Sequence, residues 1–71
     1  MIYDNLTKRE KEVLDYVISG LSNDEIARLM FKCEGWIGAV VSNLYAKYAV
    51  DWEPKRVKLV LKRLKEMGKI N

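Results

Sequence analysis

Few residues in this chain could carry out catalysis. Histidine, the usual general base and the commonest metal ligand, is absent, and Cys33 is the single cysteine. The Asp, Glu and Lys residues do not converge in a way that suggests an active site. A chain of 71 residues also has little room for a catalytic cleft and its supporting core. We therefore expect a binding protein and not an enzyme, with no metal and no cofactor.

The residue types that remain suit contact with a polyanion. The net charge is +3, but it is unevenly distributed. Residues 1–35 hold five Lys/Arg against seven Asp/Glu, whereas residues 36–71 hold eight against three. A basic second half suits nucleic acid, although a solvated helix face would have the same composition. Both interpretations remain open on charge alone.

The cysteine content and the hydropathy pattern restrict the cellular setting. A single cysteine cannot form an internal disulfide, so a reduced, cytoplasmic setting fits best. No apolar run approaches the length of a membrane span, and the N-terminal MIYDNL lacks a basic signal-peptide start. We expect one domain over residues 1–71 and no membrane partner.

Two stretches with the capping-box pattern, fifteen residues apart, mark the elements that would position a binding surface. In Thr7-Lys8-Arg9-Glu10 and Ser22-Asn23-Asp24-Glu25, a hydroxyl can accept from the N3 amide while the Glu reaches back to the cap. With Gly20 between them, they predict a short helix, a tight corner and a second short helix. This is the opening half of a helix-turn-helix, which commonly offers a helix to the DNA major groove.

Apolar spacing extends the prediction to a compact, four-helix, all-α domain containing a helix-turn-helix, with helices over about 7–19, 22–30, 34–48 and 54–67. The buried stripe expected in the third helix is Ile37, Val41, Leu44, Tyr45 and Tyr48. The core stripe expected in the fourth is Val57, Val60, Leu61, Leu64 and Met67. Leu59 lies off that stripe and hints at a partner surface, while Glu10 is placed on or beside the solvated side of the first helix.

The first half of the chain resembles the LuxR/GerE-type DNA-binding domain. The resemblance is carried by LTKREKEVLDYVISGLSNDEIARLMF: a Leu-Thr, an Arg-Glu, an apolar run, a Gly-Leu-Ser-Asn corner and a Glu-Ile-Ala. It covers about residues 6–50, more loosely in its second half, and the chain is nearly all domain, in which it is similar to small stand-alone members. The resemblance implies a transcriptional regulator that places helix 34–48 in the major groove.

The resemblance also implies a set of DNA-contacting residues. The groove-facing set would be Trp36, Gly38, Ala39 and Ser42, with Asn43 beside it, and Lys47 matches a position that tends to meet the DNA backbone. The family usually has Thr at the position of Trp36, a basic residue at Gly38 and His at Val40. No Arg, Lys or Gln remains in the groove-facing set for bidentate base contacts, so direct readout by this helix is expected to be weak.

Each of these positions has a structural alternative. Gly35 and Gly38 could allow close helix packing instead of close approach to a phosphate or partner. Trp36 could be an exposed contact residue or could pack at the edge of the core. Ser42 and Asn43 could contact bases and phosphates or simply face solvent.

Phosphate contacts are expected from several further groups. Lys32, just before the third helix, is a candidate, as are Lys55 and Arg56. The helix start at Thr7 and Lys8 could also meet a phosphate.

Two functions follow from these observations. The first is a DNA-binding transcriptional regulator, with a possible homodimer through helix 54–67. The second is a protein-interaction module in which an uncharged patch at Trp36, Gly38, Ala39 and Val40 docks on another regulator or on the transcription machinery.

Overall fold

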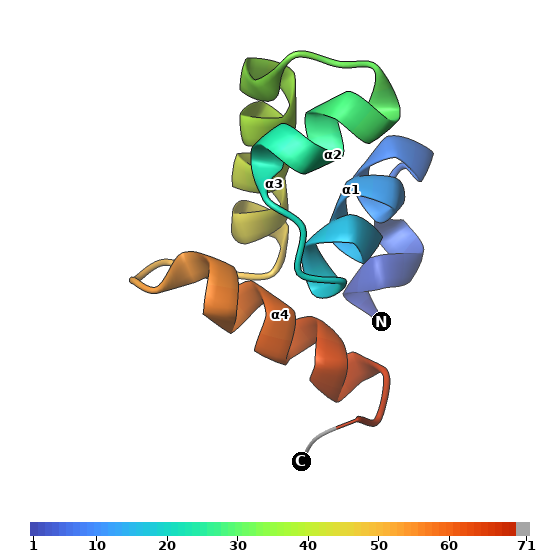
Figure 1. Ribbon diagram of the computed structural model, residues 1–71. Coiled ribbons are helices and arrows are strands. Elements are labelled where there is room, and N and C mark those ends of the chain that lie inside the picture. Colours follow the sequence, from blue (N-terminus) through green and yellow to red (C-terminus); the bar gives the residue numbers. More distant parts are fainter. Residues whose placement is uncertain (70–71) are drawn as a thin grey trace.

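The computed structural model describes residues 1–69 and contains four α-helices after one short 3-10 segment (Figure 1). The elements are η1 (Ile2–Asn5), α1 (Lys8–Ile18), α2 (Asn23–Met30), α3 (Glu34–Lys47) and α4 (Lys55–Glu66). No β-strand occurs within residues 1–69. The predicted all-α class and the four helices are confirmed, with ends within one or two residues of the predicted bounds.

Both capping boxes form and start α1 and α2. The Glu10 amide donates to Thr7 Oγ1 over 3.2 Å, while the Thr7 amide donates to Glu10 Oε1 over 2.9 Å. Ser22 and Glu25 repeat this arrangement with distances of 3.2 and 2.9 Å. Each cap satisfies amides that have no partner within the helix, which stabilises a helix by about 1 kcal/mol.

The corner between α1 and α2 depends on a left-handed residue. Gly20 adopts φ 91°, and the Leu21 amide donates to Tyr16 O over 3.2 Å, which closes the end of α1. Leu21 then packs against the core that contains the fully buried Ile26. The chain therefore turns sharply enough for α2 to pack on α1 and α3.

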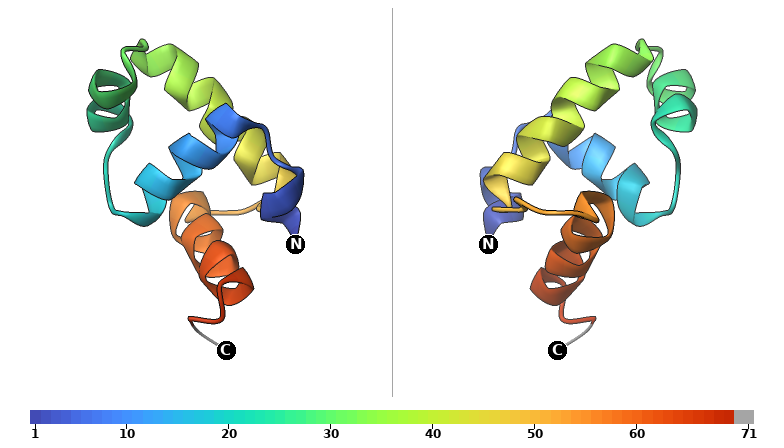
Figure 2. Two further views of the ribbon diagram at one scale, coloured as in Figure 1. Left: turned by 90° about the vertical axis from the view of Figure 1, so that its right-hand side faces the viewer. Right: turned by 90° about the vertical axis from the view of Figure 1, so that its left-hand side faces the viewer.

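The core lies where α1, α2 and α3 meet. Val13, Leu14, Ile26, Ile37 and Leu44 are all fully buried there. Figure 2 shows α3 crossing α1, with α4 extending below them and away from α2. α4 contacts α1 and α3. The first three helices thus form a packed unit that supports α3, and α4 closes its lower end.

The buried face of α4 differs from the predicted one. Leu59, predicted to lie off the core, is fully buried, whereas Val57, Leu61 and Met67 are 54%, 43% and 43% exposed. The prediction chose the more apolar stripe of the helix. Leu59 and Arg63 lie on the side of α4 that meets the rest of the bundle, and Val60 of the predicted stripe also packs against the core. The predicted stripe is therefore wrong for Val57, Leu61 and Met67, which face outward, and is confirmed for Val60.

Polar contacts complete the attachment of α4. The Tyr48 hydroxyl donates to Glu66 Oε1 over 2.5 Å, and the Ile2 amide donates to Glu66 Oε2 over 2.7 Å. The Arg63 guanidinium lies 3.6 Å from the centre of the Tyr3 ring. Burial and the hydrogen bond to Glu66 raise the pKa of the Tyr48 hydroxyl, so it stays protonated as a donor. These bonds join α4 to α3 and to the N-terminal segment.

Candidate nucleic-acid interface

The outer side of α3 carries the predicted contact residues. Ala39, Ser42 and Asn43 are exposed, and they follow one another along one side of the helix. Lys47 is exposed at its C-terminal end, and Lys32 is exposed just before its first turn. The structure therefore brings these residues onto one elongated surface, with a lysine near each end.

The first half of this surface has almost no side-chain bulk. A Cβ added at Gly35 or at Gly38 would meet no atom within 4 Å. The alternative that these glycines permit close helix packing is therefore wrong, because no neighbouring helix approaches them. Together with Ala39, they let the backbone of α3 come close to whatever it contacts.

Trp36 lies at the edge of this surface and is only half-buried. Its indole packs against the hydrophobic core, and the Lys32 ammonium lies 5.0 Å from the centre of the ring. Trp36 is thus both an edge-packing residue and a partly accessible one. Val40, placed in the uncharged patch from the sequence, is buried with 8% exposure, because it faces the core beside Ile37 and Val41. The patch is correspondingly smaller than predicted.

Lys47 is held in place by an ion pair that was not predicted. Its Nζ donates to Glu10 Oε1 over 2.7 Å, and the Glu10 side chain is 8% exposed against 42% for Lys47. Glu10 was expected on or beside the solvated side, but Lys47 and the Thr7 amide together compensate its burial. The Lys47 hydrogen bond and then the Thr7 amide lower the pKa of Glu10. An ammonium has three donors, so Lys47 keeps capacity for a phosphate.

Two other predicted phosphate contacts have internal partners. Arg56 donates to Leu21 O and, over 2.7 Å, to Asn23 Oδ1, so it joins α4 to the start of α2. Lys55 lies 5.9 Å from the centre of the Tyr45 ring. The Arg56 guanidinium is therefore already engaged in linking α4 to the start of α2. Thr7 and Lys8 are exposed at the start of α1, where the cap already uses the Thr7 side chain.

The turn between α2 and α3 contains one feature that the sequence analysis missed, the conformation of Phe31, and one that the resemblance had implied, Cys33 at the N-cap position of α3. Phe31 adopts a left-handed conformation, φ 57° and ψ 42°, and its side chain is 94% exposed. Cys33 is the N-cap of α3, is exposed, and makes no side-chain capping bond. The sequence offered one signal for this conformation: Phe31 follows directly after α2, at a position where glycine is preferred.

The described part of the chain contains no cluster of three His, Cys, Asp or Glu residues that could hold a metal ion. Within the same residues, no helix combines the length and the apolar character needed to cross a membrane.

A family model described as "Bacterial regulatory proteins, luxR family" matches residues 4–63. The chain belongs to the luxR family. Its matched region contains the first three helices and most of α4. The fold and the family therefore agree with the helix-turn-helix inferred from the two caps.

Curated relatives of this luxR-family chain include bacterial transcriptional regulatory proteins. It is 48% identical over 48 residues to "Uncharacterized transcriptional regulatory protein YhcZ" of Bacillus subtilis, covering 68% of this chain and 22% of that protein. It is 47% identical over 45 residues to the "CsgBAC operon transcriptional regulatory protein" of Escherichia coli, covering 63% and 21%. The chain thus spans about a fifth of the length of these relatives. No solved structure matches it.

Proposed function

We propose that the chain is a DNA-binding transcriptional regulator that inserts α3 into the major groove. The observation that carries this proposal is the exposed outer side of α3, supported from behind by α1 and α2 and flanked by Lys32 and Lys47. The four helices act as one unit in this function. The lone, exposed Cys33 is compatible with a reducing cytoplasm, and binding requires no catalytic group.

Affinity in this proposal comes mainly from charge, and base recognition is modest. Asn43 can make a bidentate contact to adenine, and Ser42 can donate to or accept from a base edge or a phosphate. Gly35, Gly38 and Ala39 contribute close approach of the backbone but no side-chain hydrogen bonds. Binding should therefore weaken steeply with salt, by about 0.9 log units per phosphate contact for each tenfold increase in salt.

A homodimer through residues 54–67 would supply the missing specificity by pairing two half-sites. Val57, Leu61 and Leu64 lie at i, i+4 and i+7 on α4, and Val57 and Leu61 are 54% and 43% exposed. This is the spacing with which one helix packs on a second copy of itself. We expect Leu61→Glu to reduce a dimer to a monomer in analytical ultracentrifugation while leaving the helical circular dichroism unchanged. A monomer in both proteins would contradict this part of the proposal.

The competing function, docking of the Trp36 surface on another protein, has a smaller surface available. Val40 is buried and Trp36 and Gly38 are half-buried, so Ala39 is the one member of this patch that is exposed. Such a patch offers little apolar area for a protein partner. We therefore keep DNA as the proposed partner of this face.

Fluorescence anisotropy with a labelled random-sequence duplex tests the DNA proposal. We expect micromolar binding at low salt, and Lys32→Gln should reduce the salt slope by about one unit. Lys69→Gln, which removes an equal charge at the other end of the protein, is the control and should leave the slope unchanged. Failure to bind at tens of micromolar would refute the proposal, since ordinary non-specific binding reaches about that range even at physiological salt.

A further inference from the structure

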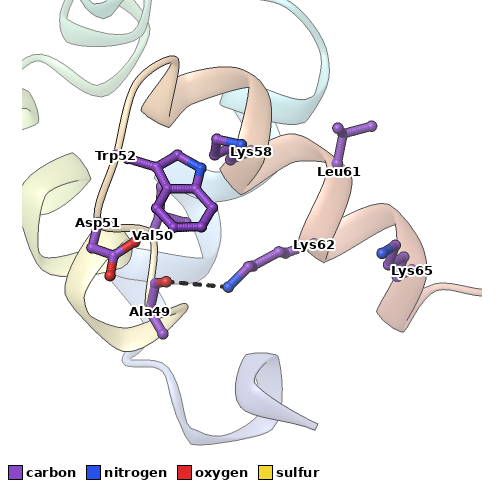
Figure 3. A pocket seen from close by; sticks show the side chains of 8 residues that line it. All are labelled: Ala49, Val50, Asp51, Trp52, Lys58, Leu61, Lys62 and Lys65. Atoms are coloured by element: carbon purple, nitrogen blue, oxygen red, sulfur yellow. Dashed lines mark hydrogen bonds between the residues drawn. The ribbon is translucent and has the colours of Figure 1, made fainter.

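A cavity of about 420 Å³ lies between α4 and the segment that connects it to α3 (Figure 3). Residues 49–52 form one wall, and the side chains of α4 form the other. The cavity is at the C-terminal end of α3, at the opposite end of that helix from the turn that contains Phe31 (Figure 1). Neither the groove-facing residues of α3 nor Lys32 and Lys47 line it.

One wall of this cavity is an exposed aromatic ring. Trp52 is 64% exposed, and the Lys58 ammonium lies 4.9 Å from the centre of its ring. Figure 3 shows the indole standing over the space between the connecting segment and α4. A tryptophan this exposed contributes little to the core, but its ring can stack on a planar group.

The opposite wall carries three ammonium groups on one side of α4. Lys58, Lys62 and Lys65 are spaced four and three residues apart, so they lie next to one another on the helix surface. Lys62 Nζ donates to Tyr48 O over 2.8 Å and to Ala49 O over 3.2 Å, which fixes its position beside the cavity. One of its three donors remains for a ligand.

The lining charges favour an anion. Asp51 is the only carboxylate among the lining residues, against three lysines. Leu61 adds apolar surface to the α4 wall. A ligand that combines negative charge with a flat apolar group would satisfy both kinds of wall.

We propose that this cavity binds a small planar anion, a ring bearing a phosphate or a carboxylate, of the size of a nucleoside monophosphate. The ring stacks on Trp52, and the anionic group meets Lys62 and Lys65. The cavity volume is within the range of about 300–1,000 Å³ that small-molecule sites occupy. This site is separate from the proposed DNA contact of α3, although it shares Leu61 with the proposed dimer face.

Nuclear magnetic resonance of the full chain tests the proposal. Adenosine 5′-monophosphate, adenosine and inorganic phosphate are titrated separately, each to about 10 mM, a range suited to millimolar affinity. The monophosphate should shift the resonances of the Trp52 indole N–H and of the amides of residues 49–52 and 58–65. It should bind about tenfold more tightly than adenosine or inorganic phosphate alone. The Ser42 and Asn43 amides should not move.

Matched variants identify the residues responsible. Trp52→Ala and Lys65→Gln should each lower the affinity for the monophosphate by about fivefold or more. Both side chains are exposed, so the fold should persist. Lys69→Gln, outside the cavity, should have no effect.

Three results would overturn the assignment: no shift with the monophosphate, an equal affinity for inorganic phosphate alone, or an equal weakening of monophosphate binding by Lys69→Gln.

Discussion

Replacing Phe31 by glycine should stabilise the protein. The residue is held at φ 57° and ψ 42°, and a left-handed conformation costs an L-residue roughly 1–2 kcal/mol. The phenyl ring is 94% exposed, so its removal should sacrifice little burial. Glycine also adds conformational freedom to the unfolded chain, which opposes folding by about 0.5–1 kcal/mol and offsets part of the relieved strain. The net expected gain is about 1 kcal/mol, equivalent to an increase in Tm of roughly 4–8 °C for a domain of this size.

Thermal unfolding followed by circular dichroism measures this effect, and Phe31→Ala is the matched control. Alanine also removes the ring but keeps the steric cost of the left-handed conformation, so its free energy of unfolding should stay within about 0.5 kcal/mol of the parent. The reasoning fails if the glycine and alanine variants melt at the same temperature, because position 31 would then carry no backbone strain. It also fails if alanine is strongly destabilising, because the ring would then be buried.

Three further predictions concern α3 and its support. Cys33→Ser should add the missing N-cap bond and raise stability by about 1 kcal/mol in urea unfolding, and a loss of stability would contradict the cap assignment. Lys47 and Thr7 lower the pKa of Glu10 below its usual 4.5, so the resulting stability is present above that value and disappears as pH falls through the folded-state pKa. Glu10→Gln should therefore flatten the loss of stability below pH 4.5 seen in acid titrations, and an unchanged profile would count against the ion pair. Gly38→Lys enters open space and adds a basic group to the outer side of α3. It should tighten DNA binding and steepen the salt slope by about one unit, whereas unchanged binding would argue that α3 does not meet DNA.

The parts of the fold that could be predicted from the sequence are those determined by neighbouring residues. Each capping box involves groups three residues apart, and the corner at Gly20 requires one left-handed residue. Such contacts form with little dependence on the rest of the chain. The same applies to the outer side of α3, where helical spacing alone aligns Ala39, Ser42 and Asn43.

The incorrect predictions concern side chains whose environment comes from distant residues. Glu10 is buried because Lys47, thirty-seven positions away, pairs with it. Leu59 is buried where α4 meets α1 and α3, whereas most of the stripe that periodicity selected is exposed or only half-buried. Hydrophobic periodicity ranks the faces of a helix by composition, but it does not include the direction from which the neighbouring helices approach.

The amino-acid sequence by itself determined where the helices begin and which side of α3 is free of charge, because caps and helical periodicity act over a few residues. Tertiary packing alone decided which side of α4 is buried, how Glu10 and Lys47 pair, and where Trp52 and three lysines line a cavity. These features arise from contacts between segments distant in the chain, and their geometry exists only once the helices have packed.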